Sequence, residues 1–507
     1  MGAGLRLTAA AASGAALAFC FPPHSLSILA WVSVAMLMAV SLGASYRAAF
    51  TCGFVHGAAF YVIGVPWIYT VMRAYGNLNV IESAGVFAAL AGTLSLYPAI
   101  FCLCLARLGR VSITTACLAA PFLWVALEFA KTHFPFHGFP WNLLGYAGAR
   151  HLGLLQLVSL TGIYGLSFVL AGCNAFAAWL FLARPRHPWV VGTVAGGIML
   201  SAVLVGDQFV PQEAPDRVAA MVQLNFPQFM EYPPDWFERH AADLEEIERL
   251  SADPSKPRPG VIIWPEAPAP FYWQDPRFST LLSRIAQTAG NHVLTGVVDW
   301  KLPAGASSGR LEPYNTAILV DPTGRRVFSY DKIHLVPFGE YVPLRRWLTF
   351  AGRLTAEVGD FRSGSSYAVG ELPGGSFGVF ICYEGVYPDE VRQFVDGGAR
   401  LLINISNDGW LQNSGGGEQH LEMVRVRAVE NRRWLLRATN TGITASVDPY
   451  GRVAARFARD VRGLFRAPYG FRKDLTLYAR WGDWFAWLCA AAAATAVLGS
   501  GFLRKKS

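Results

Sequence analysis

Charged residues are scarce in this 507-residue sequence. They make up 15% of it, whereas hydrophobic residues make up 53%, and an average soluble protein carries roughly 25% charged residues. Only eleven of the 78 charged side chains fall within residues 1–206. This composition excludes a disordered chain, a fibrous repeat and an ordinary cytosolic globule. It predicts a membrane protein with one large water-soluble region, and the length alone suggests about three domains.

The soluble region also lacks the excess of basic charge that a nucleic-acid-binding domain needs. The net charge is +8, but residues 1–206 contribute +7 and the tail Arg504, Lys505 and Lys506 contributes +3. Residues 207–503 therefore carry a net charge of −2. The basic residues lie beside apolar segments, where they set the orientation in a membrane. We expect no nucleic-acid partner.

Cysteine is nearly absent from the soluble region. Of eight cysteines, seven lie in apolar stretches: Cys20, Cys52, Cys102, Cys104, Cys117, Cys173 and Cys489. Cys382 has no second soluble cysteine to pair with, so it is either an inert buried thiol or a functional one. No Cys/His pair has metal-ligand spacing, since His292, His334 and His420 are scattered, and no phosphate-binding glycine loop follows a strand. We expect no metal and no cofactor.

Eight apolar stretches approach the ~20 residues that cross a membrane as a helix. They cover roughly residues 7–22, 26–43, 50–71, 83–106, 112–130, 154–182, 188–206 and 484–503. Basic residues concentrate in alternate connections, at Arg6, Arg47, Arg107/Arg110, Arg184/Arg186 and the C-terminal tail, which the positive-inside rule places in the cytoplasm. The predicted domains are therefore a membrane domain (1–206, about seven helices), an extracytoplasmic domain (207–480) and a C-terminal membrane helix (484–503). Both termini are expected in the cytoplasm, with residues 1–22 retained as a first span.

The connection between residues 131 and 150 is too rich in Gly and Pro to span a membrane. It contains the aromatic residues Phe134, Phe136, Phe139, Trp141 and Tyr146. Such a segment is typical of an interfacial aromatic belt. The alternative is a lipid-facing entrance beneath the soluble domain, together with Tyr232 and the loop Gly409–Gly417.

The soluble region alternates between strand-length apolar runs and amphipathic stretches. Strands are expected at 218–223, 260–264, 292–299, 316–321, 326–330, 377–382 and 401–406, and helices near 235–250, 277–289, 389–395 and 418–434. This alternation predicts an α/β fold with its sheet buried under helices.

Three reactive side chains stand at the ends of these expected strands. Glu266 ends VIIWPE, Lys332 follows the hairpin in FSYDKIHLVPFGEYVP, and Cys382 ends FGVFICYE. A carboxylate can take a thiol's proton, and a cation can stabilise the oxyanion that follows nucleophilic attack. The three residue types therefore suffice for acyl transfer. Each alone is weak evidence, because a strand-end Glu is usually a solvated carboxylate, Lys332 beside Asp331 is usually a surface ion pair, and Cys382 can be an inert thiol.

These motifs resemble the nitrilase superfamily, and within it the family of membrane-bound acyltransferases that modify lipoproteins. The similar segments are VQLNFPQ (222–228), IIWPEAP (262–268), YDKIHLVPFGEYVP (330–343), ICYEGVYP (381–388), NISNDGW (404–410) and RAVENRRWLLRATNTGITA (427–445). The FCFPP segment and the FPWNLLGY loop of the N-terminal part are similar too. The resemblance implies an α-β-β-α sandwich carried by a bundle of about eight transmembrane helices.

The resemblance also implies the roles of individual residues. Glu266 would be the general base, Lys332 the oxyanion stabiliser and Cys382 the nucleophile, with Glu340 orienting Lys332 or the attacking amine. Supporting or substrate-binding residues would be Tyr383, Glu384, Tyr232 and Trp410. Tyr232 departs from the family, which often has Trp there. Glu384 alternatively pairs with an arginine, and the loop Gly409–Gly417 is either a lid or a solvent loop.

The function implied is transfer of an acyl chain from a membrane phospholipid to the N-terminal amine of a diacylated lipoprotein through a Cys382 thioester. The partners would be the phospholipid donor, the lipoprotein acceptor and membrane lipids, and the protein would be a monomer in a bacterial inner membrane. Two alternatives are a membrane-anchored amidohydrolase and a transporter or receptor. Against transport, the spans offer only Glu82 and Glu128 as interior acids.

Overall fold

The computed structural model describes residues 2–76, 78–135, 137–229, 232–252, 260–302, 308–341, 361–412 and 414–503. The chain divides into two compact units. The first consists of Met1–Thr70, Leu78–Pro211 and Thr476–Ser507, and the second of Val71–Asn77 and Gln212–Leu475. The basic tail Arg504–Lys506, Phe136 of the aromatic loop and Asn413 of the glycine-rich loop lie outside the described residues.

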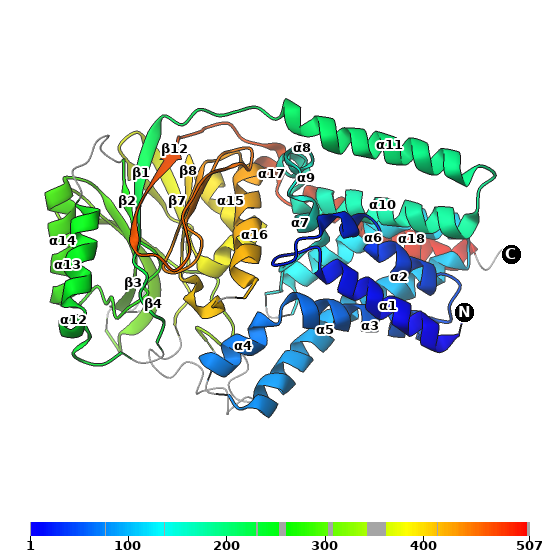
Figure 1. Ribbon diagram of the computed structural model, residues 1–507, viewed down its shortest axis with the longest axis horizontal. Helices are drawn as coiled ribbons and strands as arrows, with labels where there is room; N and C mark the ends of the chain where they lie inside the picture. The colour runs from blue at the N-terminus through cyan, green and yellow to red at the C-terminus, as the bar shows by residue number, and fades with distance from the viewer. Residues whose placement is uncertain are drawn as a thin grey trace. The chain divides into compact units, whose positions relative to one another are not determined.

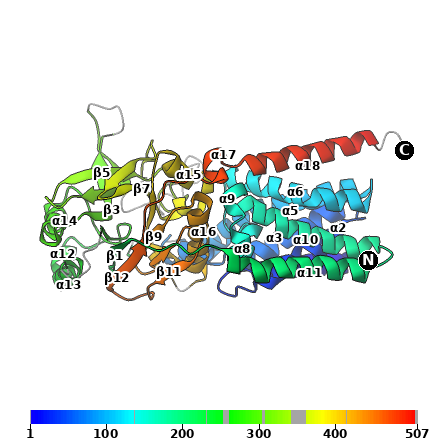
Figure 2. The same ribbon diagram turned by 90° about the horizontal axis from the view of Figure 1, so that it is seen from above.

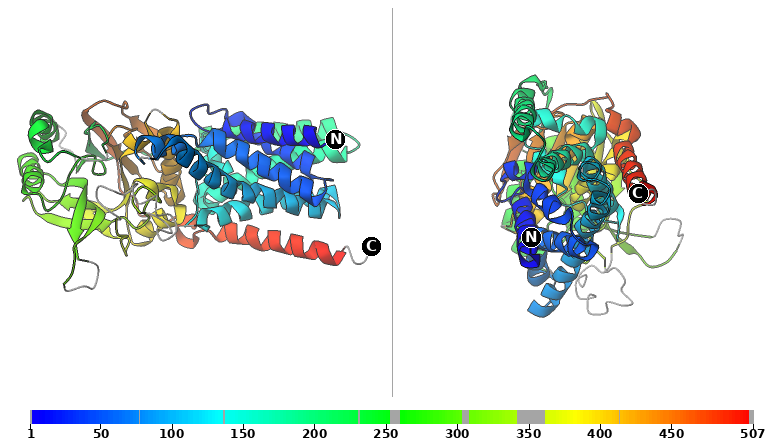
Figure 3. Two further views of the ribbon diagram at one scale, coloured as in Figure 1. Left: turned by 90° about the horizontal axis from the view of Figure 1, so that it is seen from below. Right: turned by 90° about the vertical axis from the view of Figure 1, so that its right-hand side faces the viewer.

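The first unit is a bundle of helices that lie side by side (Figures 2 and 3). Its longer helices are α1 (Ala3–Ala18), α2 (Ser33–Ser41), α3 (Tyr46–Gly64), α5 (Val80–Gly109), α6 (Ile113–His133), α10 (Ile163–Ala183), α11 (Pro188–Gly206) and α18 (Trp484–Leu503). Short helices are α4 (Trp67–Ala74, whose end from Val71 belongs to the second unit), α7 (Leu144–Gly148), α8 (Leu152–Leu155), α9 (Val158–Thr161) and α17 (Leu477–Trp481).

The prediction of a helical region with several membrane spans is confirmed. The number of candidate spans among the described residues is smaller than the eight that we expected. Among the described residues, α5, α6, α10 and α18 are long and apolar enough to cross a membrane. Helices α3 and α4 would make a fifth span together, although they bend by 54° where Pro66 separates them. Proline has no backbone N–H to continue a helix. The expected span at 26–43 contains a short 3₁₀ helix, Ser27–Trp31, followed by nine-residue α2.

The second unit contains two six-stranded mixed sheets. The first has the order β12-β1-β2-β3-β4-β5 and the second the order β11-β10-β9-β8-β7-β6. The first-sheet strands are β1 (Arg217–Gln223), β2 (Ile262–Ile263), β3 (Val293–Lys301), β4 (Glu312–Val320), β5 (Arg326–Asp331) and β12 (Gly463–Tyr469). The second-sheet strands are β6 (Val369–Leu372), β7 (Gly375–Ile381), β8 (Leu401–Ser406), β9 (Leu435–Thr439), β10 (Ala445–Val447) and β11 (Val453–Arg456).

The two sheets pack between two layers of helices (Figure 1). Helices α12 (Trp236–Arg239), α13 (Ala241–Ser251) and α14 (Pro276–Ala289) lie beside the first sheet, and α15 (Pro388–Asp396) and α16 (Gly416–Asn431) beside the second. Parallel pairing joins β1, β2 and β3 in one sheet and β7, β8 and β9 in the other. The expected four-layer α/β architecture is therefore present. Because the ends of parallel strands meet at one sheet edge, residues that follow β2, β7 and β8 can converge.

Local sequence explains where helix α14 begins and ends. Helix α14 is preceded by the capping residue Asp275, whose side chain accepts a hydrogen bond from the Arg277 N–H at 2.9 Å, and Pro276 occupies its first position. The helix ends at Ala289 and is followed by Gly290, whose φ of +55° favours glycine. Its buried face carries Phe278, Leu281, Leu282 and Ile285, which pack on the first sheet. Burying such side chains contributes ~1.5–3 kcal/mol each.

Candidate active site

Glu266 follows β2 and reaches across to the second sheet. Its side chain is buried, and Oε1 accepts a hydrogen bond from Asn315 Nδ2 at 2.8 Å. Oε2 accepts one from the backbone N–H of Asn407, just after β8, at 2.9 Å. The carboxylate is therefore held from both sheets. Such fixed geometry suits a group that must take a proton from a defined direction.

Lys332 follows β5 and is only 1% exposed. Its Nζ lies 3.0 Å from the Glu340 carboxylate and 3.5 Å from Glu266 Oε1. Burial by itself lowers the pKa of this ammonium, but the charges of Glu340 and Glu266 outweigh burial and raise it above its ordinary value. Lys332 therefore remains a cation in the interior of the domain.

Glu340 connects Lys332 to its own loop. Its Oε1 accepts hydrogen bonds from Asn315 Nδ2 at 2.8 Å and from Lys332, and Oε2 accepts one from the Val336 N–H at 2.8 Å. The structure thus places Glu340 against Lys332, and Asn315 bridges the Glu266 and Glu340 carboxylates.

Cys382 comes directly after β7 in a tight turn. Its φ is +50°, a left-handed conformation that is unfavourable for a residue with a side chain. The thiol is half-buried, and burial followed by the Glu266 carboxylate raises its pKa, whereas Lys332 lowers it. The resting thiol is consequently protonated, so it needs a base before it can attack. The structure brings Glu266, Lys332 and Cys382 into one electrostatic cluster, which we call the Glu–Lys–Cys cluster.

Glu384 holds the cysteine turn to the lysine loop. Its Oε2 accepts from the Ile381 N–H at 2.7 Å, and Oε1 accepts from Tyr330 Oη at 2.7 Å and the Ile333 N–H at 2.7 Å. Burial and then Glu390 raise its pKa to about 7. No arginine pairs with Glu384 among the described residues. Through these contacts, the buried Glu384 side chain holds the backbone just before Cys382 against the loop that carries Lys332.

The remaining predicted residues, Tyr383, Tyr232 and Trp410, make contacts with other groups of the second unit. Tyr383 is half-buried and packs edge-on against Tyr387, with ring centroids 5.3 Å apart. Tyr232 donates its hydroxyl to the Pro268 carbonyl at 3.0 Å, two residues beyond Glu266. Trp410 packs edge-on against Tyr75 at 4.9 Å, and Tyr75 Oη lies 3.4 Å from the Gly409 carbonyl oxygen.

A second polar cluster lies next to Cys382 and consists of Asp408, His420 and Arg437. These residues are far from Cys382 in the sequence, so the sequence alone does not connect them with it. Asp408, His420 and Arg437 are each at most 2% exposed, and Asp408 Oδ2 accepts from Arg437 Nη2 at 2.6 Å. Possible metal-ligand atoms of Cys382, Asp408 and His420 lie within 4.8 Å of one another. Arg437, however, already supplies the cation to Asp408. The only signals in the sequence are the Asp of NISNDGW and an arginine inside the apolar strand LLRAT.

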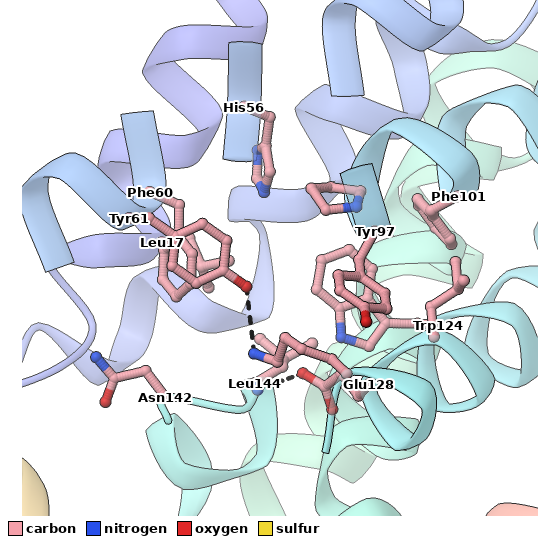
Figure 4. Close-up of a pocket in the computed structure, with 13 residues that line it drawn as sticks. Leu17, His56, Phe60, Tyr61, Tyr97, Phe101, Trp124, Glu128, Asn142 and Leu144 are labelled. Carbon is pink, nitrogen blue, oxygen red and sulfur yellow. Dashed lines mark hydrogen bonds between the residues drawn. The ribbon is translucent and has the colours of Figure 1, made fainter. Parts of the chain in front are cut away.

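The first unit contains a cavity among α1, α3, α5 and α6 (Figure 4). Two charged side chains of α6 line it and hold the aromatic loop. Lys131 Nζ donates to the Trp141 carbonyl and to Tyr61 Oη, both at 3.3 Å, and Glu128 Oε1 accepts from the Leu144 N–H at 2.7 Å. Trp141 is 2% exposed, so its ring is part of the packing of this unit.

Comparisons with known proteins assign both parts of the sequence. A family model described as "Carbon-nitrogen hydrolase" matches residues 218–467, which extend from β1 to β12. A second, "Apolipoprotein N-acyltransferase N-terminal domain", matches residues 13–176. The chain is 37% identical to an apolipoprotein N-acyltransferase of Geobacter metallireducens over 97% of this chain and 94% of that protein. It is 32% identical to those of Methylococcus capsulatus and Azotobacter vinelandii, over 97% and 98% of this chain and 95% of each relative.

The chain belongs to the apolipoprotein N-acyltransferase family. The resemblance to the nitrilase superfamily is thereby confirmed, and the chain is an enzyme of that superfamily. In this member of the apolipoprotein N-acyltransferase family, the carbon-nitrogen hydrolase part carries every residue of the Glu–Lys–Cys cluster.

Proposed function

We propose that this protein transfers an acyl chain from a membrane phospholipid to the N-terminal α-amino group of a diacylglyceryl-cysteine lipoprotein through a thioester on Cys382. The contacts of Lys332 support this assignment of the site most directly. Its buried ammonium lies between the carboxylates of Glu266 and Glu340, and its charge lowers the pKa of the Cys382 thiol. Family membership over nearly the whole chain supports the choice of substrates.

In the first half-reaction, Glu266 takes the proton of the Cys382 thiol, and Sγ attacks the carbonyl carbon of the phospholipid ester. The resulting oxyanion is stabilised by the Lys332 ammonium, a charge that is already in place before the reaction. The ester C–O bond then breaks, and Glu266 returns its proton to the departing alkoxide. The products are the Cys382 thioester and a lysophospholipid.

In the second half-reaction, the α-amine of the acceptor attacks the thioester carbonyl. Glu266 takes the proton from the attacking nitrogen, Lys332 again stabilises the oxyanion, and the C–S bond breaks. The proton on Glu266 restores the Cys382 thiol. Because one carboxylate is base and acid in turn, its fixed position between Asn315 and Asn407 serves both half-reactions.

We further propose that the chain crosses a bacterial inner membrane eight times, through α1, the Ser27–Ser41 segment, α3, α5, α6, α10, α11 and α18. Alternation of basic charge among the connections supports this threading. It makes residues 1–206 and 484–503 the membrane part. It also places the catalytic domain, residues 207–480, in the periplasm, with both termini in the cytoplasm. The protein would act as a monomer that draws its donor from the surrounding lipid.

The fate of the acyl group distinguishes this function from that of an amidohydrolase. The protein, first acylated with phospholipid, is mixed with a synthetic diacylglyceryl-cysteine peptide, and the products are analysed by mass spectrometry. The proposal predicts that the peptide gains one acyl chain at its amino terminus and that little fatty acid is released. Free fatty acid with an unmodified peptide would establish hydrolysis, and an unacylated protein would favour a binding or transport role.

A further inference from the structure

The backbone carbonyl of Cys382 accepts a hydrogen bond from a histidine that is distant in sequence. His420 Nε2 on α16 lies 3.1 Å from this oxygen, and the His420 side chain is 2% exposed. A carbonyl oxygen can only accept, so Nε2 must carry the hydrogen. The bond reaches the residue whose left-handed φ of +50° forms the turn after β7.

Two hydrogen bonds fix the orientation of the His420 ring: Nε2 donates to the Cys382 carbonyl, and Nδ1 accepts from Arg437, which Asp408 holds in place. Nδ1 lies 3.2 Å from Arg437 Nη2 and 3.2 Å from Asp408 Oδ1, and Asp408 Oδ1 is also 2.8 Å from Ser406 Oγ. With the hydrogen on Nε2, Nδ1 of the neutral ring accepts from Arg437. Burial and then the Arg437 charge lower the pKa of His420, which keeps the ring neutral. Asp408 in turn holds Arg437 at 2.6 Å.

The hydrogen bond constrains a whole peptide unit rather than one atom. A trans peptide is planar, and its N–H points opposite to its C=O. Fixing the Cys382 oxygen therefore also fixes the direction of the Tyr383 N–H, the first backbone donor after the nucleophile. On the other side of the turn, the Ile381 N–H is held by Glu384 Oε2 at 2.7 Å. A backbone N–H fixed beside a nucleophile can stabilise an oxyanion together with a cation.

We propose that His420, oriented by Asp408 and Arg437, is a positioning residue that holds the Cys382–Tyr383 peptide so that the Tyr383 N–H and Lys332 together receive the oxyanion. The inference rests on the proposed function, since it concerns the same acyl transfer. His420 is not the general base, because its Nε2–H faces a backbone carbonyl. It is not a metal ligand in this arrangement, because both ring nitrogens are engaged.

Three substitutions in the full-length protein test this role. His420→Gln places a side-chain N–H near the position of Nε2, His420→Asn reaches only to that of Nδ1, and His420→Leu has no donor. The matched control is His292→Asn, a half-buried histidine just before β3. For each variant, the rate of Cys382 acylation and the donor KM are measured in micelles of defined phospholipid, and alkylation by iodoacetamide is measured separately, because alkylation forms no oxyanion.

We expect His420→Asn and His420→Leu to slow acylation by about 10²-fold, the loss that follows removal of one oxyanion donor. Donor KM and alkylation should stay within about twofold of wild type on the same reasoning, and His420→Gln should recover most of the acylation rate. Unchanged acylation in His420→Leu would overturn the inference. So would equal losses in acylation and alkylation, which indicate a distorted fold, or a Gln variant as slow as the Asn variant. If the wild type itself formed no thioester, the proposed function would fail instead.

Discussion

Lys332 owes its charge in the protein interior to two neighbouring carboxylates. Burial lowers the pKa of Lys332, but the charges of Glu340 and Glu266 raise it by more than burial lowers it. The folded protein therefore binds this proton more tightly than the unfolded chain does. A group of this kind contributes stability that is fully present below its ordinary pKa. The contribution is lost only as the pH rises through the higher pKa of the folded state. At neutral pH the ion pairs around Lys332 are therefore fully formed.

Glu340→Gln should destabilise the protein at neutral pH, because it removes one of the two carboxylates that neutralise a buried cation. Breaking a buried pair by removing one partner costs about 3–5 kcal/mol, and we expect the lower end because Glu266 remains. Denaturation in detergent, followed by tryptophan fluorescence, measures this change. Glu371→Gln, at an exposed position of β6, is the control. Equal stability of the two variants would exclude the pairing of Lys332 with Glu340.

Glu266→Gln should separate two properties of Cys382 that are usually lost together. The carboxylate raises the pKa of the thiol, so its removal should shift the pH profile of iodoacetamide alkylation toward lower pH. Burial, the larger cause, remains and keeps the thiol pKa above its ordinary value. Acylation should nevertheless fall by about 10²-fold or more, since the base is gone. An alkylation profile that moved toward higher pH would contradict this account of the thiol's environment.

The sequence placed Glu266, Lys332 and Cys382 at the ends of expected strands, and the family resemblance joined them and added Glu340 from PFGEYVP. The sequence could not name the groups that hold them. Asn315 binds Glu266 and Glu340 only because β4 lies next to β3 and β5 in the folded sheet. Likewise, His420 contacts Cys382 only after α16 packs against the Cys382–Val386 turn. Such partners depend on tertiary structure and have no fixed spacing in the chain.

Strand β3 supports the segment that carries Glu266 through a residue that has no side chain, Gly296. A Cβ on Gly296 would lie 2.6 Å from the Glu266 Cα and 2.7 Å from the Ala267 nitrogen. The Gly296 N–H also donates to the Pro265 carbonyl at 3.1 Å. The strand and the segment that carries Glu266 are thus in backbone contact, and only glycine permits that approach.

Gly296→Ala should therefore displace Glu266 while β3 keeps its pairing with β4. Misplacement of a catalytic group by about 1 Å can cost 10²-fold in rate, so acylation should fall by about that factor. Gly172→Ala in α10 is the matched control, since nothing lies within 4 Å of the added Cβ. A Gly296→Ala protein with the acylation rate of the control would show that Glu266 does not depend on this contact.

The apolar strands of the second unit were predictable, whereas several short strands near its end were not. The apolar run Val218–Gln223 is buried from Ala219 onward and corresponds to β1, and Leu401–Ser406 is buried throughout and corresponds to β8. The helix expected to reach Trp434 ends at Asn431, where Arg432 takes a left-handed conformation and β9 follows. Strands β10 and β11 are three and four residues long, and β11 is largely exposed. Both strands are too short to show the two-residue alternation of hydrophobic and polar side chains by which a strand is recognised in a sequence.

The proposed orientation of the protein in its membrane rests on the alternation of basic charge, and it can be tested at described, exposed positions. Single cysteines replace Glu371 in the catalytic unit or Arg186 between α10 and α11, in a Cys382→Ser background. A thiol reagent that cannot cross membranes should label the first from the periplasmic side only and the second from the cytoplasmic side only. Labelling of both positions from one side would refute the proposed threading.

The thioester on Cys382 is the central claim, and intact-protein mass spectrometry tests it most directly. Purified full-length protein is incubated with a phospholipid of defined acyl chains and no acceptor amine. The account predicts a mass increase of one acyl chain, carried by Cys382 in peptide maps, removed by hydroxylamine and absent from Cys382→Ser, because a hydroxyl is a far weaker nucleophile than a thiol at this pH. An acyl group on any other residue, or a Cys382→Ser variant acylated as fast as the wild type, would contradict it.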